Sequence, residues 1–133
     1  MLIDFEGMDP KDAYHILTQT VIPRPVAWVL SENPDGDFNL APFSFFTPIT
    51  SNPPLLMISV GKKPTEGVFK DTRVNIEARK QFVVHIAHRD LAAAVTESSR
   101  TLPHGESELE NLDLELVEFE GSGLPRLKDC HVA

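Results

Sequence analysis

The apolar residues of this chain are grouped into short runs, and the spacing within each run predicts a helix or a strand. In residues 8–20, apolar side chains recur three or four positions apart, which predicts an amphipathic helix. Asp9 suits the N-cap of this helix and Pro10 suits its first position. The prolines in residues 21–25 predict its end, because proline cannot continue a helix.

Several other runs are short and rich in β-branched or aromatic residues, which is typical of strands. The predicted strands cover residues 25–31, 38–50, 55–60, 81–87 and 114–121. Further helices are predicted over residues 68–80 and 89–99, the second with Asp90 as its cap. Residues 26–30 and 55–60 are apolar on both strand faces. We therefore expect helices, a barrel interior or a partner subunit to cover those faces.

Composition is that of a globular protein: 133 residues, 41% hydrophobic, which we interpret as a single domain over residues 1–133. The last residues look like the start of a strand, so we expect a domain truncated at its C-terminus. A net charge of -8 without a Lys/Arg-rich run argues against nucleic-acid and membrane partners. The chain has no apolar run of about 20 residues, so a cytoplasmic location is expected.

Motifs for catalysis by the protein's own side chains are absent from the sequence. It contains no G-x-S-x-G elbow, no dinucleotide-binding glycine loop and no Walker loop. The single cysteine, Cys130, is expected to be a small buried hydrophobe. The five histidines match no zinc-binding spacing. We predict no catalytic side chain and no metal site.

Residues 38–50 place Pro42 and Ser44 inside the most apolar stretch of the chain. Because Pro42 has no N–H, the strand must lie at a sheet edge there or bulge. A bulge would leave backbone groups free to bind a planar heterocycle. A core strand with a structural kink fits the residues equally well.

Residues 59–74 combine lysines and hydroxyl side chains just before a predicted helix: Ser59, Lys62, Lys63, Thr65, Lys70 and Thr72. Ammonium groups, hydroxyls and the amides of a helix N-terminus are suited to binding a phosphate. A solvated basic turn that merely precedes a helix explains the same pattern, and the spacing alone favours that interpretation.

Three strings occur in a characteristic order: RPVAWVLS, DGDFNLAPFSFFTPITSNPPLLMISV and FKDTRVNIEARKQFVVHIA. In this order the chain, over residues 12–131, resembles the flavin reductase-like family, the FMN-binding split barrels that include flavoredoxin. The resemblance implies a mainly β fold, a six-stranded antiparallel Greek-key split β-barrel with flanking helices. It also implies a homodimer with FMN at the subunit interface.

The resemblance also implies which residues bind the cofactor. The flavin-facing residues would be Asn39, Ala41, Pro42, Phe43, Ser44 and Thr50, and those near the phosphate would be Ser59, Lys62, Lys70 and Thr72. The implied activity is an NAD(P)H-dependent flavin reductase, in which NADH or NADPH delivers hydride to the flavin. The alternative is a non-catalytic FMN-binding electron carrier or sensor.

Overall fold

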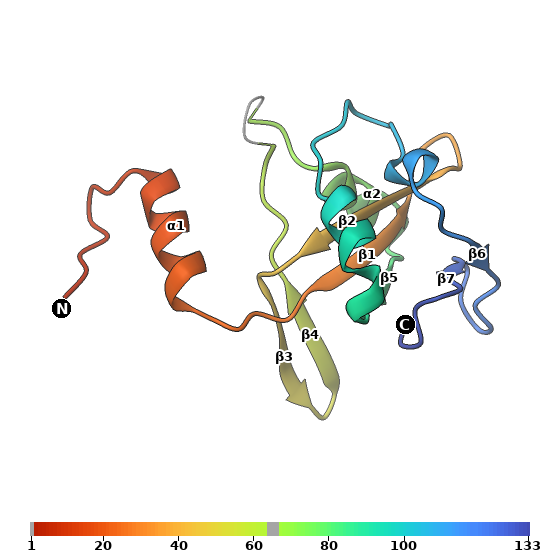
Figure 1. The fold of residues 1–133 in the computed structure, drawn as a ribbon, viewed down its shortest axis with the longest axis horizontal. Coiled ribbons are helices and arrows are strands. Elements are labelled where there is room, and N and C mark those ends of the chain that lie inside the picture. Colours follow the sequence, from red (N-terminus) through yellow and green to blue (C-terminus); the bar gives the residue numbers. More distant parts are fainter. Residues whose placement is uncertain (1, 64–66) are drawn as a thin grey trace.

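The computed structural model describes residues 2–63 and 67–133, whose strands form one three-stranded sheet and two two-stranded sheets (Figure 1). The helices are α1 (Pro10–Thr20), α2 (Asp71–Arg79) and α3 (Ala92–Glu97), with 3₁₀ turns η1 (Arg89–Leu91) and η2 (Glu108–Asn111). The strands are β1 (Ala27–Glu32), β2 (Phe38–Phe43), β3 (Phe46–Ser51), β4 (Pro54–Ile58), β5 (Val83–His85), β6 (Leu116–Val117) and β7 (Arg126–Leu127). No helix in these described ranges is long and apolar enough to span a bilayer.

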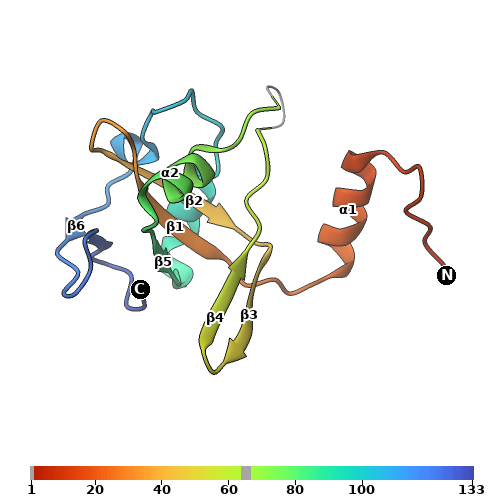
Figure 2. The same ribbon diagram turned by 180° about the vertical axis from the view of Figure 1, so that it is seen from behind.

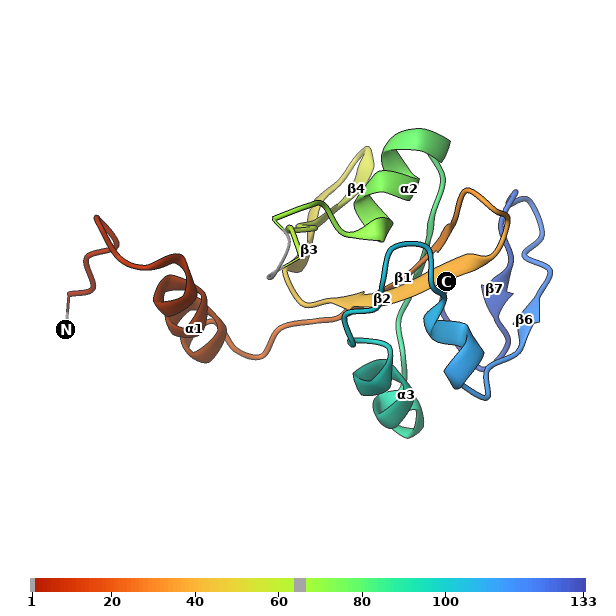
Figure 3. The same ribbon diagram turned by 90° about the horizontal axis from the view of Figure 1, so that it is seen from above.

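The central sheet has the order β2-β1-β5, and both pairings are antiparallel. Helices α2 and α3 lie on opposite sides of it (Figure 3). Successive β1 side chains point to opposite faces, so Trp28 and Leu30 pack in one apolar cluster while Ala27 and Val29 pack in another. The chain's own helices thus cover this doubly apolar strand, as one of the expected alternatives predicted.

The predicted long strand over residues 38–50 is two strands, and its break is not at Pro42. Strand β2 pairs with β1 without interruption, and Pro42 lies opposite Trp28. The expected bulge at Pro42 is therefore wrong, while the alternative of an edge position is correct, because β2 has a partner on only one side among the described residues. The chain leaves the sheet at Ser44 and Phe45, and a register shift follows between Pro48 and Thr50 in β3.

Strands β3 and β4 form a hairpin that projects from the body (Figures 1 and 2). Its large apolar side chains are exposed: Ile49, Leu55, Leu56 and Met57. The strand predicted over residues 55–60 is therefore present, but the described part of the chain does not cover it. Helix α1 also stands apart from the sheet, as the prolines after it allow, and Asp9 caps it through Lys11 N at 2.8 Å.

Three sequence expectations are corrected. The strand predicted over residues 114–121 is limited to Leu116–Val117, which pair with the equally short β7. His88, not Asp90, caps the turn before α3, since its Nδ1 accepts from Asp90 N. The described strands form three separate sheets, so they do not close into a six-stranded barrel.

Candidate functional site

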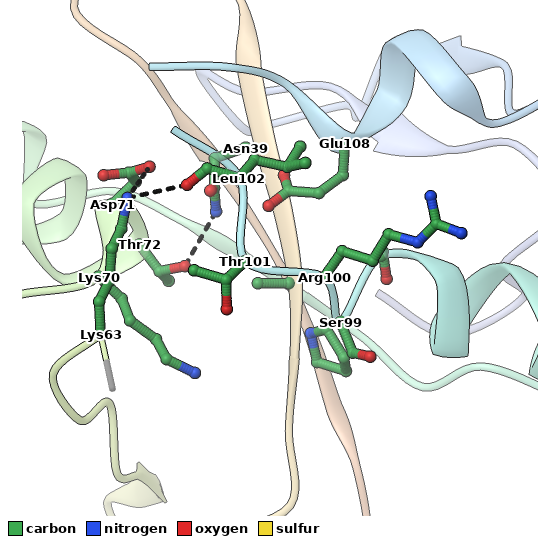
Figure 4. A pocket seen from close by; sticks show the side chains of 13 residues that line it. Asn39, Lys63, Lys70, Asp71, Thr72, Ser99, Arg100, Thr101, Leu102 and Glu108 are labelled. Atoms are coloured by element: carbon green, nitrogen blue, oxygen red, sulfur yellow. Dashed lines mark hydrogen bonds and ion pairs between the residues drawn. The ribbon is translucent and has the colours of Figure 1, made fainter. Parts of the chain in front are cut away.

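A small cavity lies where β2, the N-terminus of α2 and the segment after α3 meet (Figure 4). Its volume is about 50 Å³. This is room for one or two waters or one small group, and far less than a tricyclic ring needs. The lining residues are Asn39, Ala41, Pro42, Lys63, Lys70, Asp71, Thr72, Ser98, Ser99, Arg100, Thr101, Leu102 and Glu108.

Polar side chains of α2 attach the helix to the sheet. Thr72 Oγ1 accepts a hydrogen bond from Asn39 Nδ2 at 2.9 Å. One turn later, Asn75 Nδ2 donates to Asn33 Oδ1 at 2.8 Å and to Ser31 Oγ at 3.2 Å. All five side chains are buried, and buried polar groups need such partners. This network fixes the first turn of α2 beside the cavity.

An ionic cluster holds the segment after α3 against α2. The buried Lys63 Nζ lies 3.5 Å from Asp71 Oδ2 and donates to Leu102 O at 3.1 Å. His104 Nδ1 pairs with the other oxygen of the Asp71 carboxylate. Asp71 is therefore neutralised by its neighbours, and it contributes little repulsion toward an anion in the cavity.

Glu108 and Ser107 seal the open edge of β2. Glu108 Oε2 accepts from Leu40 N at 2.9 Å, and Ser107 Oγ donates to Phe38 O. Pro42 lies two residues after Leu40, so its nitrogen faces the same edge, where no donor is needed. Burial raises the pKa of the Glu108 carboxyl, although the Leu40 hydrogen bond opposes this shift.

Lys70 is a further cation in the cavity lining, at the N-cap of α2. It has no carboxylate partner within the described ranges, and its Nζ lies 5.3 Å from the centre of the Phe43 ring. Burial lowers its pKa, because desolvation penalises the ammonium form. Arg100, in contrast, pairs with Glu97 at 2.7 Å and points away from Lys70 (Figure 4).

Both ring nitrogens of His85 are engaged by the main chain. His85 is fully buried, with Nδ1 3.1 Å from Trp28 O and Nε2 accepting from Leu127 N at 3.0 Å. Because a backbone carbonyl must accept and a backbone N–H must donate, the ring is neutral with its proton on Nδ1. Burial also lowers the pKa of His85. This geometry identifies His85 as structural, and it is not among the residues that line the cavity.

The structure brings together only part of the predicted site. The predicted residues that line the cavity are Asn39, Ala41, Pro42, Lys70 and Thr72, and Phe43 lies beneath Lys70. Those outside the lining are Ser44, Thr50, Ser59 and Lys62. Thr50 is exposed in the hairpin, Ser59 N donates to Phe45 O, and Lys62 lies over the Phe69 ring. Thr65 falls outside the described residues.

Sequence reasoning missed the wall formed by residues 98–102 and the contribution of Glu108. The sequence predicts a helix over residues 89–99 followed by a polar loop over residues 100–113, and neither pattern indicates a binding site. The available signal was the hydroxyl-rich string Ser98, Ser99 and Thr101, which directly follows a helix. Hydroxyl groups beside a lysine indicate an anion site, but these hydroxyls lie near Lys70 only in the folded chain, because the two segments are far apart in the sequence.

Comparison with known proteins finds one similar sequence and two similar structures among its matches. The chain is 40% identical over 127 residues to the uncharacterized protein YwrF of Bacillus subtilis, covering 96% of this chain and 61% of that protein. The structure of nitrilotriacetate monooxygenase component B from Bacillus cereus matches with a TM-score of 0.89 and 39% identity, over 98% of this chain and 63% of the other. Pseudomonas fluorescens 2-nitrobenzoate 2-nitroreductase NbaA matches with a TM-score of 0.85 and 32% identity, over 98% and 61%.

The chain therefore spans just over three-fifths of the length of these proteins. The family model for the flavin reductase like domain matches residues 19–133, which is most of the chain. This agrees with the resemblance carried by the ordered strings in the sequence. The chain belongs to the flavin reductase-like family.

Proposed function

We propose that this chain binds FMN, with the phosphate in the cavity, and acts as an NAD(P)H-dependent flavin reductase. The observation that carries the proposal is the cavity itself. It places the partly buried ammonium of Lys70 at the N-terminus of α2 beside hydroxyl groups, in a space too small for the flavin ring. Such a site suits the terminal anionic group of a larger ligand.

The residues present fit a phosphate. The backbone amides of Asp71 and Thr72 lie in the first turn of α2, where no intrahelical acceptor is available. Lys70 supplies a charge, and Thr101 adds a hydroxyl to the lining. The two carboxylates nearby should repel a phosphate only weakly. Asp71 is paired with Lys63, and the raised pKa of Glu108 favours its neutral form.

The ring would lie outside the cavity and along β2 toward Ser44. When bound, a flavin accepts hydride from NADH or NADPH and passes electrons on. The chain's own task is to hold and orient the ring and to tune its charge. This agrees with the lack of a catalytic motif in the sequence. A homodimer is part of the proposal, since the apolar hairpin of β3 and β4 is exposed.

Lys70→Gln tests the phosphate site. Loss of one charge-assisted contact should weaken FMN about tenfold to a hundredfold, while riboflavin binding stays unchanged. Because its lowered pKa makes Lys70 lose its charge at a lower pH than an ordinary lysine, the fall in FMN affinity with rising pH should begin below the pH at which an ordinary lysine deprotonates. Quenching of flavin fluorescence measures both, and Lys70→Arg is the matched control that keeps the charge.

Equal losses for FMN and riboflavin would show that Lys70 does not hold the phosphate. The activity is tested separately with the FMN-loaded wild-type protein. Oxidation of NADH or NADPH supports the reductase. Tight FMN binding without this oxidation would instead support an electron carrier.

A further inference from the structure

We propose that Arg24 is a positioning residue that orients the Ser44 hydroxyl toward the flavin ring and places a positive charge behind it. This inference rests on the proposed function, because it concerns the ring end of the same ligand. It adds a residue from the segment between α1 and β1, a part of the chain that contributes nothing to the cavity lining.

The Arg24 guanidinium is held in place by the main chain. Its Nη1 donates to Thr18 O and to Val21 O, the latter at 3.2 Å, at the C-terminal end of α1. Its Nε donates to Ser44 Oγ at 3.3 Å. A planar guanidinium with three N–H groups engaged has little freedom to rotate. Arg24 thus ties α1 to the point where β2 ends.

Ser44 is half-buried at the break between β2 and β3, where the chain has left its pairing with β1. Because Arg24 donates to Oγ, it occupies a lone pair and leaves the hydroxyl proton free to donate elsewhere. No acceptor for that proton is found among residues 2–63 and 67–133. A hydroxyl that accepts from a cation is also a stronger donor, since linked hydrogen bonds polarise one another.

The charge of Arg24 is not cancelled nearby. In the described ranges Arg24 has no ion-pair partner, and its side chain is half-buried. A flavin gains negative charge on reduction, and a fixed positive charge with an oriented donor favours that form. Arg24 and Ser44 together should therefore raise the midpoint potential of the bound flavin.

The test compares Arg24→Gln, Arg24→Lys, Ser44→Ala and the Arg24→Gln/Ser44→Ala double variant. We expect Arg24→Gln to weaken FMN and riboflavin alike, by about tenfold, and to lower the midpoint potential of bound FMN. Arg24→Lys should restore part of the potential because it keeps the charge. The double variant should lose less than the sum of the two single losses, because both act through one hydrogen bond.

Tyr14→Leu is the matched control for helix attachment. The Tyr14 ring packs 6.0 Å from the Phe45 ring, so this change loosens α1 without removing the guanidinium. It should leave the midpoint potential unchanged. Should Tyr14→Leu shift the potential as much as Arg24→Gln does, or should the single losses simply add, Arg24 only ties down the helix.

The two proposals fail in different ways. Wild-type protein that binds neither FMN nor riboflavin overturns the proposed function and this inference with it. Wild-type protein that binds FMN, with a potential that Arg24→Gln and Arg24→Lys both leave unchanged, overturns only the role of Arg24. Arg24→Lys keeps the charged side chain, so it provides the measurement if Arg24→Gln does not fold.

Discussion

Replacing Glu108 by Ala should destabilise the fold, because it removes a hydrogen-bond acceptor from the open edge of β2. Glu108 is 8% exposed, and its Oε2 accepts from the N–H of the fully buried Leu40 at 2.9 Å. Alanine leaves that N–H without an acceptor, which costs about 1–3 kcal/mol. The Gln variant is the matched control, because its side-chain oxygen can still accept while the charge is gone.

The wild type and the Gln variant should also differ in how their stability depends on pH. Because burial raises the pKa of Glu108, the folded state favours the protonated carboxyl more than the unfolded chain does. The wild type therefore loses stability as the pH rises through the folded-state pKa, and Glu108→Gln does not. The stability of Glu108→Gln relative to wild type should rise from acidic to neutral pH.

Urea unfolding followed by fluorescence of Trp28, the single tryptophan, measures both effects. Unfolding curves at acidic and neutral pH give the free energy of each variant. An alanine variant within about 0.5 kcal/mol of wild type would refute the argument, since such a value is typical of a surface substitution. Equal losses for the Ala and Gln variants would show that the hydrogen bond to Leu40 is not the cause.

Two further outcomes follow from burial and exposure. His85 is neutral in the fold and burial lowers its pKa, so its contribution to the free energy of unfolding should be complete above its ordinary pKa of 6.5. Below that pH the free energy of unfolding should fall by at most about 1.4 kcal/mol per pH unit. Urea unfolding at several pH values should show a flatter dependence for His85→Gln, and the same dependence as in the wild type would contradict this. Leu56 is 59% exposed in the β3–β4 hairpin, so Leu56→Asp should leave the melting temperature nearly unchanged but weaken the proposed homodimer, as measured by sedimentation. A dimer of unchanged affinity would show that this hairpin is not the subunit contact.

Local sequence patterns were sufficient for the elements that depend on neighbouring residues. Asp9 and Pro10 predicted the start of α1, because capping involves only the first turn. The lack of a polar face in residues 26–30 predicted that β1 is covered on both faces. Cys130 was expected to be buried and is 1% exposed. The helix predicted over residues 68–80 is present as α2, over Asp71–Arg79.

The cavity could not be derived in the same way, because distant segments build it. Leu40 and Glu108 are separated by 68 positions, and Asp71 and His104 by 33. A polar loop such as residues 100–113 has no periodicity that reveals which surface it packs against. Pro42 shows the same limit, since its missing N–H fits both a bulge and an open edge.

The order of motifs along the chain was enough to assign the family, because that order is a property of the sequence itself. Which side chains share one small volume depended on the packing of α2 and the segment after α3 against β2. The physical reason is the sequence separation over which each kind of interaction acts. Caps and alternation act between neighbours, whereas an enclosed cavity needs hydrogen bonds and ion pairs that form only after the sheet has brought remote segments together.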